Sequence, residues 1–256
     1  PLLGLNKVMD ANYSNDGKFI IMSAAKNGQT DLFLYKVIGN SQKQLTNDIY
    51  DDLTPSFIDN STKVIFASNR ESDTLRINKK VKIKKYNRNK DIFILDLDRP
   101  VFLKRITNTP QVNEIQPFQR GKNQYAFLSN ESGITNRYVA SYDSAISRID
   151  TTIHYRYFSV IDPVSNYSRP ILEHNEYSFS GRYSQLIFEN GEYHFHYGNS
   201  KDDALLDKAN IYPTQFMKHL LGGKDVEILF ADSAMVDSGS VDAIDINNYR
   251  FEDEQP

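Results

Sequence analysis

Residues 13–23 read YSNDGKFIIMS, a polar turn with an Asn-Asp-Gly core followed by an apolar strand that ends at a small polar residue. The same plan returns as FIDNSTKVIFAS at 57–68, as FQRGKNQYAFLS at 118–129 and, more weakly, as FSGRYSQLIFEN at 179–190. Turn residues next to a short apolar run indicate a β-hairpin. The chain is therefore a series of repeats, and the repeated unit decides the fold.

Each unit continues in the same order. A second strand begins with an acidic or amide residue in DLFLY (31–35), DIFIL (91–95) and NRYVA (136–140). A short closing strand follows in KQLTN (43–47) and KRITN (104–108). Units of about 45 residues made of four short strands are typical of a β-propeller, in which each blade buries its faces against its neighbours. We predict an all-β propeller with about four recognisable four-stranded blades, at about 8–50, 51–111, 112–172 and, in part, 173–200.

The wording of these segments resembles the repeat of TolB-type propellers, whose blades read roughly S-P-D-G-K, I-x-F-x-S, D-I-Y-x-x-D and L-T. The resemblance covers about residues 8–200, and the large TolB-like propeller proteins of Bacteroidota have close counterparts of DDLTPSF (51–57), SNRESDTL (68–75) and NYSR (166–169). The fourth unit lacks the Asp-aromatic strand, so we expect less regular geometry at 193–198.

The resemblance implies a ring of six or more blades. We therefore expect this chain to be part of a larger ring whose remaining blades lie upstream; the alternative is an irregular propeller whose other blades have diverged beyond recognition. Residues 201–256 hold twelve acidic and five basic residues, which predicts an irregular acidic arm or linker to another domain. Within it we expect a short helix at 213–221, because Gly follows an apolar run there, and a strand-like alternation at 244–251.

Composition excludes several classes of protein. The 256 residues are 39% hydrophobic and include 16 Tyr and 15 Phe, which favours a sheet-rich globular fold. A formal net charge of −3 does not indicate a nucleic-acid binder. The absence of Cys excludes disulfides, thiolate metal sites and cysteine nucleophiles. No apolar run reaches the ~18 residues of a transmembrane segment. No Gly-x-Ser-x-Gly elbow is present, so we expect no catalysis within these residues, and we expect no cofactor.

His194 and His196 are weak metal candidates. They lie two apart, which on a strand places both imidazoles on one face, but exposed or channel histidines without a ligand role are the more frequent case. A sugar or a metal in the central channel is a third hypothesis that rests on this pair and on the aromatic content. We assign no role to His154 or His174, and we interpret the carboxylates of 51–52 and 96–98 as turn caps.

An insertion carries the sharpest local charge. From Ser68 to Asp91 there are 23 positions, against 8 from Ser23 to Asp31, so about 15 residues are inserted. Residues 76–90 hold eight cations and no acid, and we predict that they form a basic hairpin. Its cations and the preceding loop are the predicted partner-binding residues, although a solvated hairpin that protects an edge strand would look the same. The set is Asn69, Arg70, Asp73, Arg76, Lys79, Lys80, Lys82, Lys84, Lys85, Arg88 and Lys90.

The TolB-type resemblance implies a function. It implies a non-catalytic scaffold of the bacterial cell envelope, periplasmic and associated with the outer membrane, that binds protein partners at its loops. The alternative is an accessory propeller that gates substrate entry in a larger peptidase or hydrolase. A second surplus of residues, between about 142 and 158, is a further insertion on the scaffold.

Overall fold

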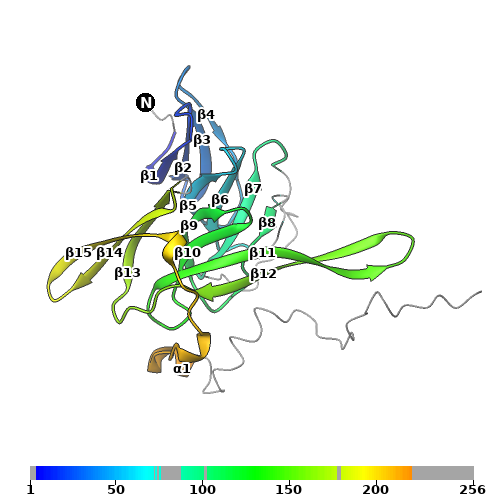
Figure 1. Cartoon of the computed structure of the whole chain (residues 1–256). Coiled ribbons are helices and arrows are strands. Elements are labelled where there is room, and N and C mark those ends of the chain that lie inside the picture. The colour runs from blue at the N-terminus through cyan, green and yellow to red at the C-terminus, as the bar shows by residue number, and fades with distance from the viewer. Residues whose placement is uncertain are drawn as a thin grey trace, which may run out of the picture.

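Four antiparallel sheets form the molecule, and consecutive strands pair in each of them (Figure 1). The computed structural model describes residues 4–71, 73, 75, 88–100, 103–177 and 180–220. The first sheet comprises β1 (Lys7–Tyr13), β2 (Phe19–Lys26), β3 (Gln29–Lys36) and β4 (Ser41–Gln44), and the second β5 (Asp52–Ile58), β6 (Lys63–Ser68), β7 (Asp91–Asp96) and β8 (Leu103–Arg105). The third comprises β9 (Glu114–Gly121), β10 (Gln124–Ser129), β11 (Asn136–Ile149) and β12 (Ile153–Pro163), and the fourth β13 (Ile171–Tyr177), β14 (Arg182–Glu189) and β15 (Glu192–Asn199). We refer to these sheets as blades one to four.

The turn of the first repeat shows why its residue types are needed. Ser14 Oγ accepts a hydrogen bond from the backbone N–H of Phe19 (2.9 Å) and donates one to Asp16 (2.7 Å). The hydrogen bond from Ser14 is the largest cause that lowers the pKa of Asp16 to about 2. Gly17 has φ +68°, a backbone conformation that glycine adopts without steric cost. The turn therefore fixes the start of β2.

In each of the first two blades, the residue that follows the repeated Asp forms a hydrogen bond with the repeated Thr. The N–H of Leu32 donates to Thr46 Oγ1 (2.9 Å), and the N–H of Ile92 donates to Thr107 Oγ1 (2.8 Å). In blade three the N–H of Arg137 donates to Ser165 Oγ (2.8 Å). The third copy of the motif exists, but 28 residues separate its two partners instead of 14 or 15.

Side chains of the inner strands connect each blade to the next. Asp10 Oδ2 accepts from the N–H of Thr54 (3.3 Å), Thr54 Oγ1 accepts from the N–H of Gln116 (3.0 Å), and Gln116 Oε1 accepts from the N–H of His174 (2.6 Å). The pairing of each inner strand with its neighbour shifts register near these positions. β1, β5, β9 and β13 therefore lie side by side, as the inner strands of a propeller do.

The apolar core lies between the blades. One cluster joins blade one to blade two, with Ile21 and Leu32 against Phe66 and Phe93. A second joins blades two and three, with Ile65 against Phe127. Blade two is therefore buried on both faces, which is how a propeller blade gains its stability.

Blade four is regular but shorter than the others. β14 and β15 pair residue by residue from Arg182 with Asn199 to Glu189 with Glu192, without a register shift. The expectation of irregular geometry at 193–198 is therefore wrong, because loss of the Asp-aromatic signature changed the side chains and not the hairpin. The departure lies in strand number, since three strands make up this sheet in the described part of the chain.

The chain then returns across blade three. η1 (Ser200–Asp202), η2 (Lys208–Asn210) and α1 (Gln215–Leu220) follow β15, and the helix lies within the range 213–221 where the sequence places one. The N–H of Thr214 donates to the carbonyl of Ser132 (2.8 Å). Within the residues that the structure covers, no helix is long and apolar enough to cross a membrane. The acidic arm from residue 221 onward, with 244–251, lies outside the described residues.

Candidate functional site

A two-stranded arm projects from blade three (Figure 1). β10 pairs with β11 only as far as Ser141, whereas β11 and β12 continue to pair with each other out to Ile149 and Ile153. We call residues 142–159 the arm. At its tip Asp150 accepts a hydrogen bond from the N–H of Thr152 (3.0 Å), which closes the turn. An isolated two-stranded hairpin is at best marginally stable in water, so a hairpin of this length is expected to be stabilised by a further contact.

One face of the arm is apolar and exposed. Directly opposed residues of an antiparallel pair share a face, and Ile146 lies opposite Tyr155, while Ile149 lies opposite Ile153. Tyr157 lies on the same face, and the exposed fractions of the five residues are 49%, 63%, 52%, 52% and 62% for Ile146, Ile149, Ile153, Tyr155 and Tyr157. The opposite face carries polar and charged side chains such as Arg148 and His154. A segregated apolar surface of this kind is typical of an interaction site.

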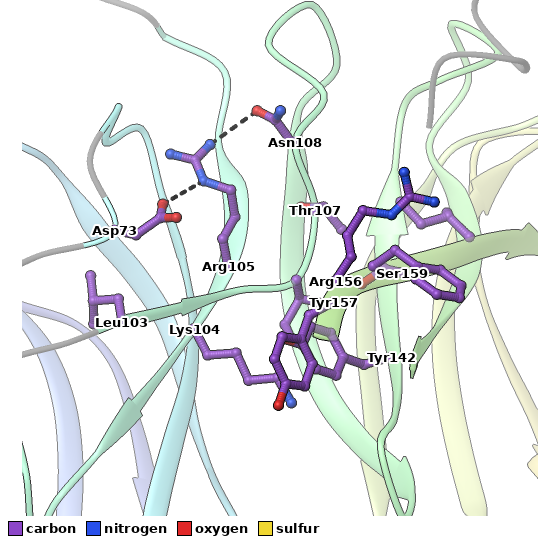
Figure 2. A pocket seen from close by; sticks show the side chains of 13 residues that line it. Asp73, Leu103, Lys104, Arg105, Thr107, Asn108, Tyr142, Arg156, Tyr157 and Ser159 are labelled. Atoms are coloured by element: carbon purple, nitrogen blue, oxygen red, sulfur yellow. Dashed lines mark hydrogen bonds and ion pairs between the residues drawn. The ribbon is translucent and has the colours of Figure 1, made fainter. Parts of the chain in front are cut away.

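A pocket of about 390 Å³ lies at the root of the arm, between β8 of blade two and β12 of blade three (Figure 2). Residues 103–108 form one side and residues 156–159 the other. Tyr142 and Tyr157 stack with ring centroids 5.9 Å apart and planes 14° apart. Lys104 crosses from blade two and places Nζ 3.3 Å from the centroid of the Tyr142 ring. The pocket therefore joins an aromatic wall to a cation.

The pocket lining is cationic. It contains Lys104, Arg105 and Arg156 and one carboxylate, Asp73. Asp73 is already engaged, because Arg105 Nε donates to it (2.8 Å) while Arg105 Nη1 reaches Asp91 (3.0 Å). Desolvation, reinforced by the nearby ammonium group of Lys63, lowers the pKa of Lys104 to about 8. The arrangement is suited to an anionic group.

Two of the predicted partner-binding residues are buried. Arg70 is 2% exposed, and its guanidinium donates to Asp52 (2.7 Å) and Asp48 (3.1 Å). Asn69 is 5% exposed and accepts a hydrogen bond from the N–H of Asp51 (2.8 Å). The prediction that they contact a partner is therefore wrong: buried carboxylates draw the arginine inward, and both side chains hold the junction of blades one and two.

Of the remaining predicted partner-binding residues, three belong to the described part of the chain and six do not. Asp73 and Arg88 are exposed, and Asp73 lines the pocket. Lys90 is partly buried, which lowers its pKa. The other cations of the insertion lie outside the described residues, so the basic hairpin stays a prediction; they are Arg76, Lys79, Lys80, Lys82, Lys84 and Lys85.

The histidine pair gains no third ligand. His194 and His196 are exposed on β15, and the ring of His196 lies 5.8 Å from that of Tyr167. Across 4–71, 73, 75, 88–100, 103–177 and 180–220, the one group of ligand-type side chains close enough for a metal is Asp31, Asp48 and Asp52. The Arg70 guanidinium supplies the positive charge at Asp48 and Asp52, so this group is an ion-pair cluster.

The functional residues that sequence reasoning missed are those of the arm and the pocket. The surplus at 142–158 located the insertion, and the alternation of Tyr155 and Tyr157 with polar residues was the available signal for an apolar face. Nothing in the sequence indicated a role for Lys104, because its partner Tyr142 belongs to another blade.

No protein-family model matches the chain, and no curated protein matches it. Solved structures do. A TolB structure from Agrobacterium tumefaciens is 11% identical with a TM-score of 0.56, covering 79% of this chain and 65% of that one. TolB from Acinetobacter baumannii is 12% identical with a TM-score of 0.53, covering 78% and 42%. A puromycin-hydrolysing peptidase from Mycobacterium tuberculosis is 12% identical with a TM-score of 0.50, covering 83% and 33%.

These similarities establish the fold. The chain is a TolB-like β-propeller, which confirms the all-β class and the TolB-type propeller repeat; the resemblance to the proteins of Bacteroidota stays a prediction. It spans less than two thirds of the length of each of the three solved chains.

Proposed function

We propose that this chain is a non-catalytic protein-interaction propeller of the bacterial cell envelope, periplasmic and part of an outer-membrane-associated assembly, which binds a partner protein through the arm. The observation that carries the proposal is the exposed apolar face of the arm: Ile146, Ile149, Ile153, Tyr155 and Tyr157. The TolB-like fold supports the envelope setting.

Energetics favour a partner for this face. Burying one large aliphatic or aromatic side chain is worth about 1.5–3 kcal/mol. Five such side chains on a ribbon that, among the described residues, pairs with no third strand therefore offer a strong contact without any change in the blades. Tyr and other aromatic residues are also enriched where interfaces concentrate their binding energy.

Site-specific photo-crosslinking in the source organism tests the proposal. A photoreactive residue is placed at position 149 or 153 of the arm and, as the matched control, at position 38, where Ile38 is 73% exposed on blade one. We expect one defined envelope protein to crosslink from the arm and not from position 38. Absence of a product from the arm, or the same products from all three positions, would contradict the proposal.

The alternative function is an accessory propeller of a larger peptidase. It is favoured by the similarity of the fold to the peptidase from M. tuberculosis. Labelling the envelope fraction with a fluorophosphonate probe for serine hydrolases separates the two functions. A labelled polypeptide that contains these residues would favour the peptidase, whereas an unlabelled one favours the scaffold.

A further inference from the structure

We propose that the pocket at the root of the arm binds an extended acidic segment of the partner protein, which pairs with the outer edge of β12 and places a carboxylate against Lys104. This inference rests on the proposed function and names the chemistry of the segment that the partner presents. It is carried by three features of the pocket: strand edges, charge and aromatic side chains.

The first feature is the pair of strand edges. β12 is the last strand of its sheet and, in the portion of the chain described, pairs only with β11. β8 is the last strand of its own sheet, and the N–H of Leu103 on it already donates to the carbonyl of Asp73 (2.9 Å), so β12 offers the more open edge. Consecutive residues of both strands, 103–105 and 156–159, line the pocket. A pocket bounded by strand edges accepts an extended peptide, because the edge of a sheet offers main-chain hydrogen bonds and alternate side chains enter the space beside it.

The second feature is charge. Three cations line the pocket, and its one carboxylate, Asp73, is paired with Arg105. Lys104 makes no salt bridge with any carboxylate of the described residues, and its ammonium group faces the ring of Tyr142 (Figure 2). Partial desolvation is unfavourable for an ammonium group, and it lowers the pKa of Lys104 to about 8, with Lys63 acting in the same direction and Asp59 against it. A carboxylate from a ligand would remove that cost.

The third feature is the aromatic wall. The stacked rings of Tyr142 and Tyr157 lie beside Lys104, and Ile106 and Ile161 complete the apolar lining. Side chains two apart on an extended peptide lie on one face, about 7 Å from each other. A segment that alternates acidic and apolar residues can therefore place its carboxylates on the one face that meets Lys104 and the rings, and its apolar side chains on the other face. A free phosphate would use the cation but neither the strand edge nor the rings, and a uronic acid would not use the strand edge.

Fluorescence anisotropy with a defined probe tests the inference. The probe is a fluorescein-labelled heptapeptide that alternates Val or Phe with Glu, and the matched peptide has Gln in place of each Glu. We expect the Glu peptide to bind at least about tenfold more tightly than the Gln peptide. Equal affinities, or full displacement by millimolar phosphate or glucuronate, would overturn the inference.

Variants of Lys104 locate the binding. Lys104→Met, which removes the charge and keeps most of the stem, is expected to weaken the Glu peptide by about tenfold, while Lys36→Met on blade one leaves it unchanged. Binding to the unaltered protein should weaken between pH 7 and 9 as Lys104 loses its proton, whereas Lys104→Arg keeps the affinity across that range. An unchanged affinity in Lys104→Met would place the peptide elsewhere and overturn the inference.

The two proposals fail separately. Crosslinking from position 149 without binding of the Glu peptide leaves the scaffold function standing and overturns the acidic segment. Binding of the Glu peptide without any crosslink from the arm supports the pocket chemistry and overturns the arm as the docking surface.

Discussion

Two buried arginines occupy comparable junctions between blades but have different surroundings. Arg70, between blades one and two, uses all three nitrogens of its guanidinium: Nε donates to Ser68 Oγ (2.9 Å), Nη1 to Asp48 (3.1 Å) and Nη2 to Asp52 (2.7 Å). The rings of Phe66 and Phe93 lie within 6 Å of the guanidinium, at 5.8 and 5.9 Å. Asp31 lies beside Asp48 and Asp52 and accepts a hydrogen bond from Gln44, and we call all of these side chains the first cluster.

Arg137, between blades three and four, is equally buried but less well paired. It is 1% exposed, with Nη2 against Asp203, Nη1 3.7 Å from Glu176 and its guanidinium 3.6 Å from the centroid of the Tyr183 ring. We call the polar side chains around it the second cluster. Arg120 Nη1 and Asp203 Oδ2 form an ion pair at 3.2 Å, and His174 Nε2 lies 3.6 Å from Glu176 Oε2. Buried atoms of the second cluster that make neither an ion pair nor a hydrogen bond among the residues covered by the structure belong to Arg137, His174, Glu176 and Gln185.

The difference shows that burial and pairing are separate properties of a blade junction. Each buried polar group without a partner costs about 1–3 kcal/mol. The first cluster avoids that cost, whereas the second incurs it, and the apolar cluster beside it is small, with Leu128, Ile171 and Ile187. Blade four is therefore held less tightly than blade two.

The largest expected effect is that of removing the first arginine. Arg70→Met leaves Asp48 and Asp52 buried without a counterion and should lower the free energy of unfolding by about 3–5 kcal/mol. Arg137→Met should cost about 1–2 kcal/mol, because it also removes unpaired donors. Urea unfolding measures both, with the exposed Arg99→Met as the control. Equal losses at the two arginines would remove the distinction between the clusters.

Hydrogen exchange is expected to show the same order without any mutation. Amides of β14 should exchange through local opening at a free energy about 2 kcal/mol below that of β6, which lies in the core between two blades. Mass spectrometry of peptic fragments measures both strands in one sample. Protection of β14 equal to that of β6 would mean that blade four opens only when the whole chain unfolds.

The sequence predicted those parts of the fold that depend on short spacings. Leu32 bonds to Thr46 across 14 residues and Ile92 to Thr107 across 15, and both pairs belong to repeated segments. The turn at 14–17 specifies its own hydrogen bonds. The equivalent Ser165 was missed because the arm lies between it and Arg137. Periodicity reveals a motif only where insertions do not interrupt it.

The site depends on contacts between distant segments, which no spacing predicts. Lys104 meets Tyr142 across two blades, and Arg137 meets Asp203 from a position 66 residues away. Arg70 was assigned to an exposed loop because a polar residue after a strand is usually solvated, whereas the carboxylates of Asp48 and Asp52 draw it inward. The arm was visible as an insertion, but its apolar face depends on the register of β11 and β12.

A smaller effect of opposite sign is expected at Gln185. Both polar atoms of its side chain lack hydrogen-bond partners in the part of the chain that the structure describes, and the residue is 2% exposed. Gln185→Met, which has a similar volume, should raise the free energy of unfolding by about 1 kcal/mol because it removes an unsatisfied amide. Gln44→Met is the matched control in the first cluster, where Gln44 Nε2 donates to Asp31 (3.0 Å), and it should destabilise the protein. Destabilisation by both substitutions would show that Gln185 has a partner in solution.

The smallest expected effect is a pH response that differs in sign between the clusters. Burial lowers the pKa of His174, with Arg137 acting in the same direction and Glu176 against it. Below the ordinary histidine pKa of about 6.5 the unfolded chain gains a proton that folded His174 does not, so its contribution to stability falls as the pH falls. Burial raises the pKa of Asp31 to about 7, so folded Asp31 holds a proton that the unfolded chain has lost, and its contribution to stability rises as the pH falls from 7 toward 4.

Urea unfolding at pH 7.5 and pH 5.5 separates the two responses. Relative to the unaltered protein, the free energy of unfolding of His174→Gln should change in the stabilising direction on acidification, because the group that resists protonation is gone. That of Asp31→Asn should change by about 1 kcal/mol in the destabilising direction over the same interval. The free energy of unfolding of the double variant should be nearly the same at both pH values if these two groups govern the response. If both single variants shifted the pH dependence of the free energy of unfolding in the same direction, acidification would act alike on the two junctions. The difference in pairing between Arg70 and Arg137 would then not determine how the blades respond to pH.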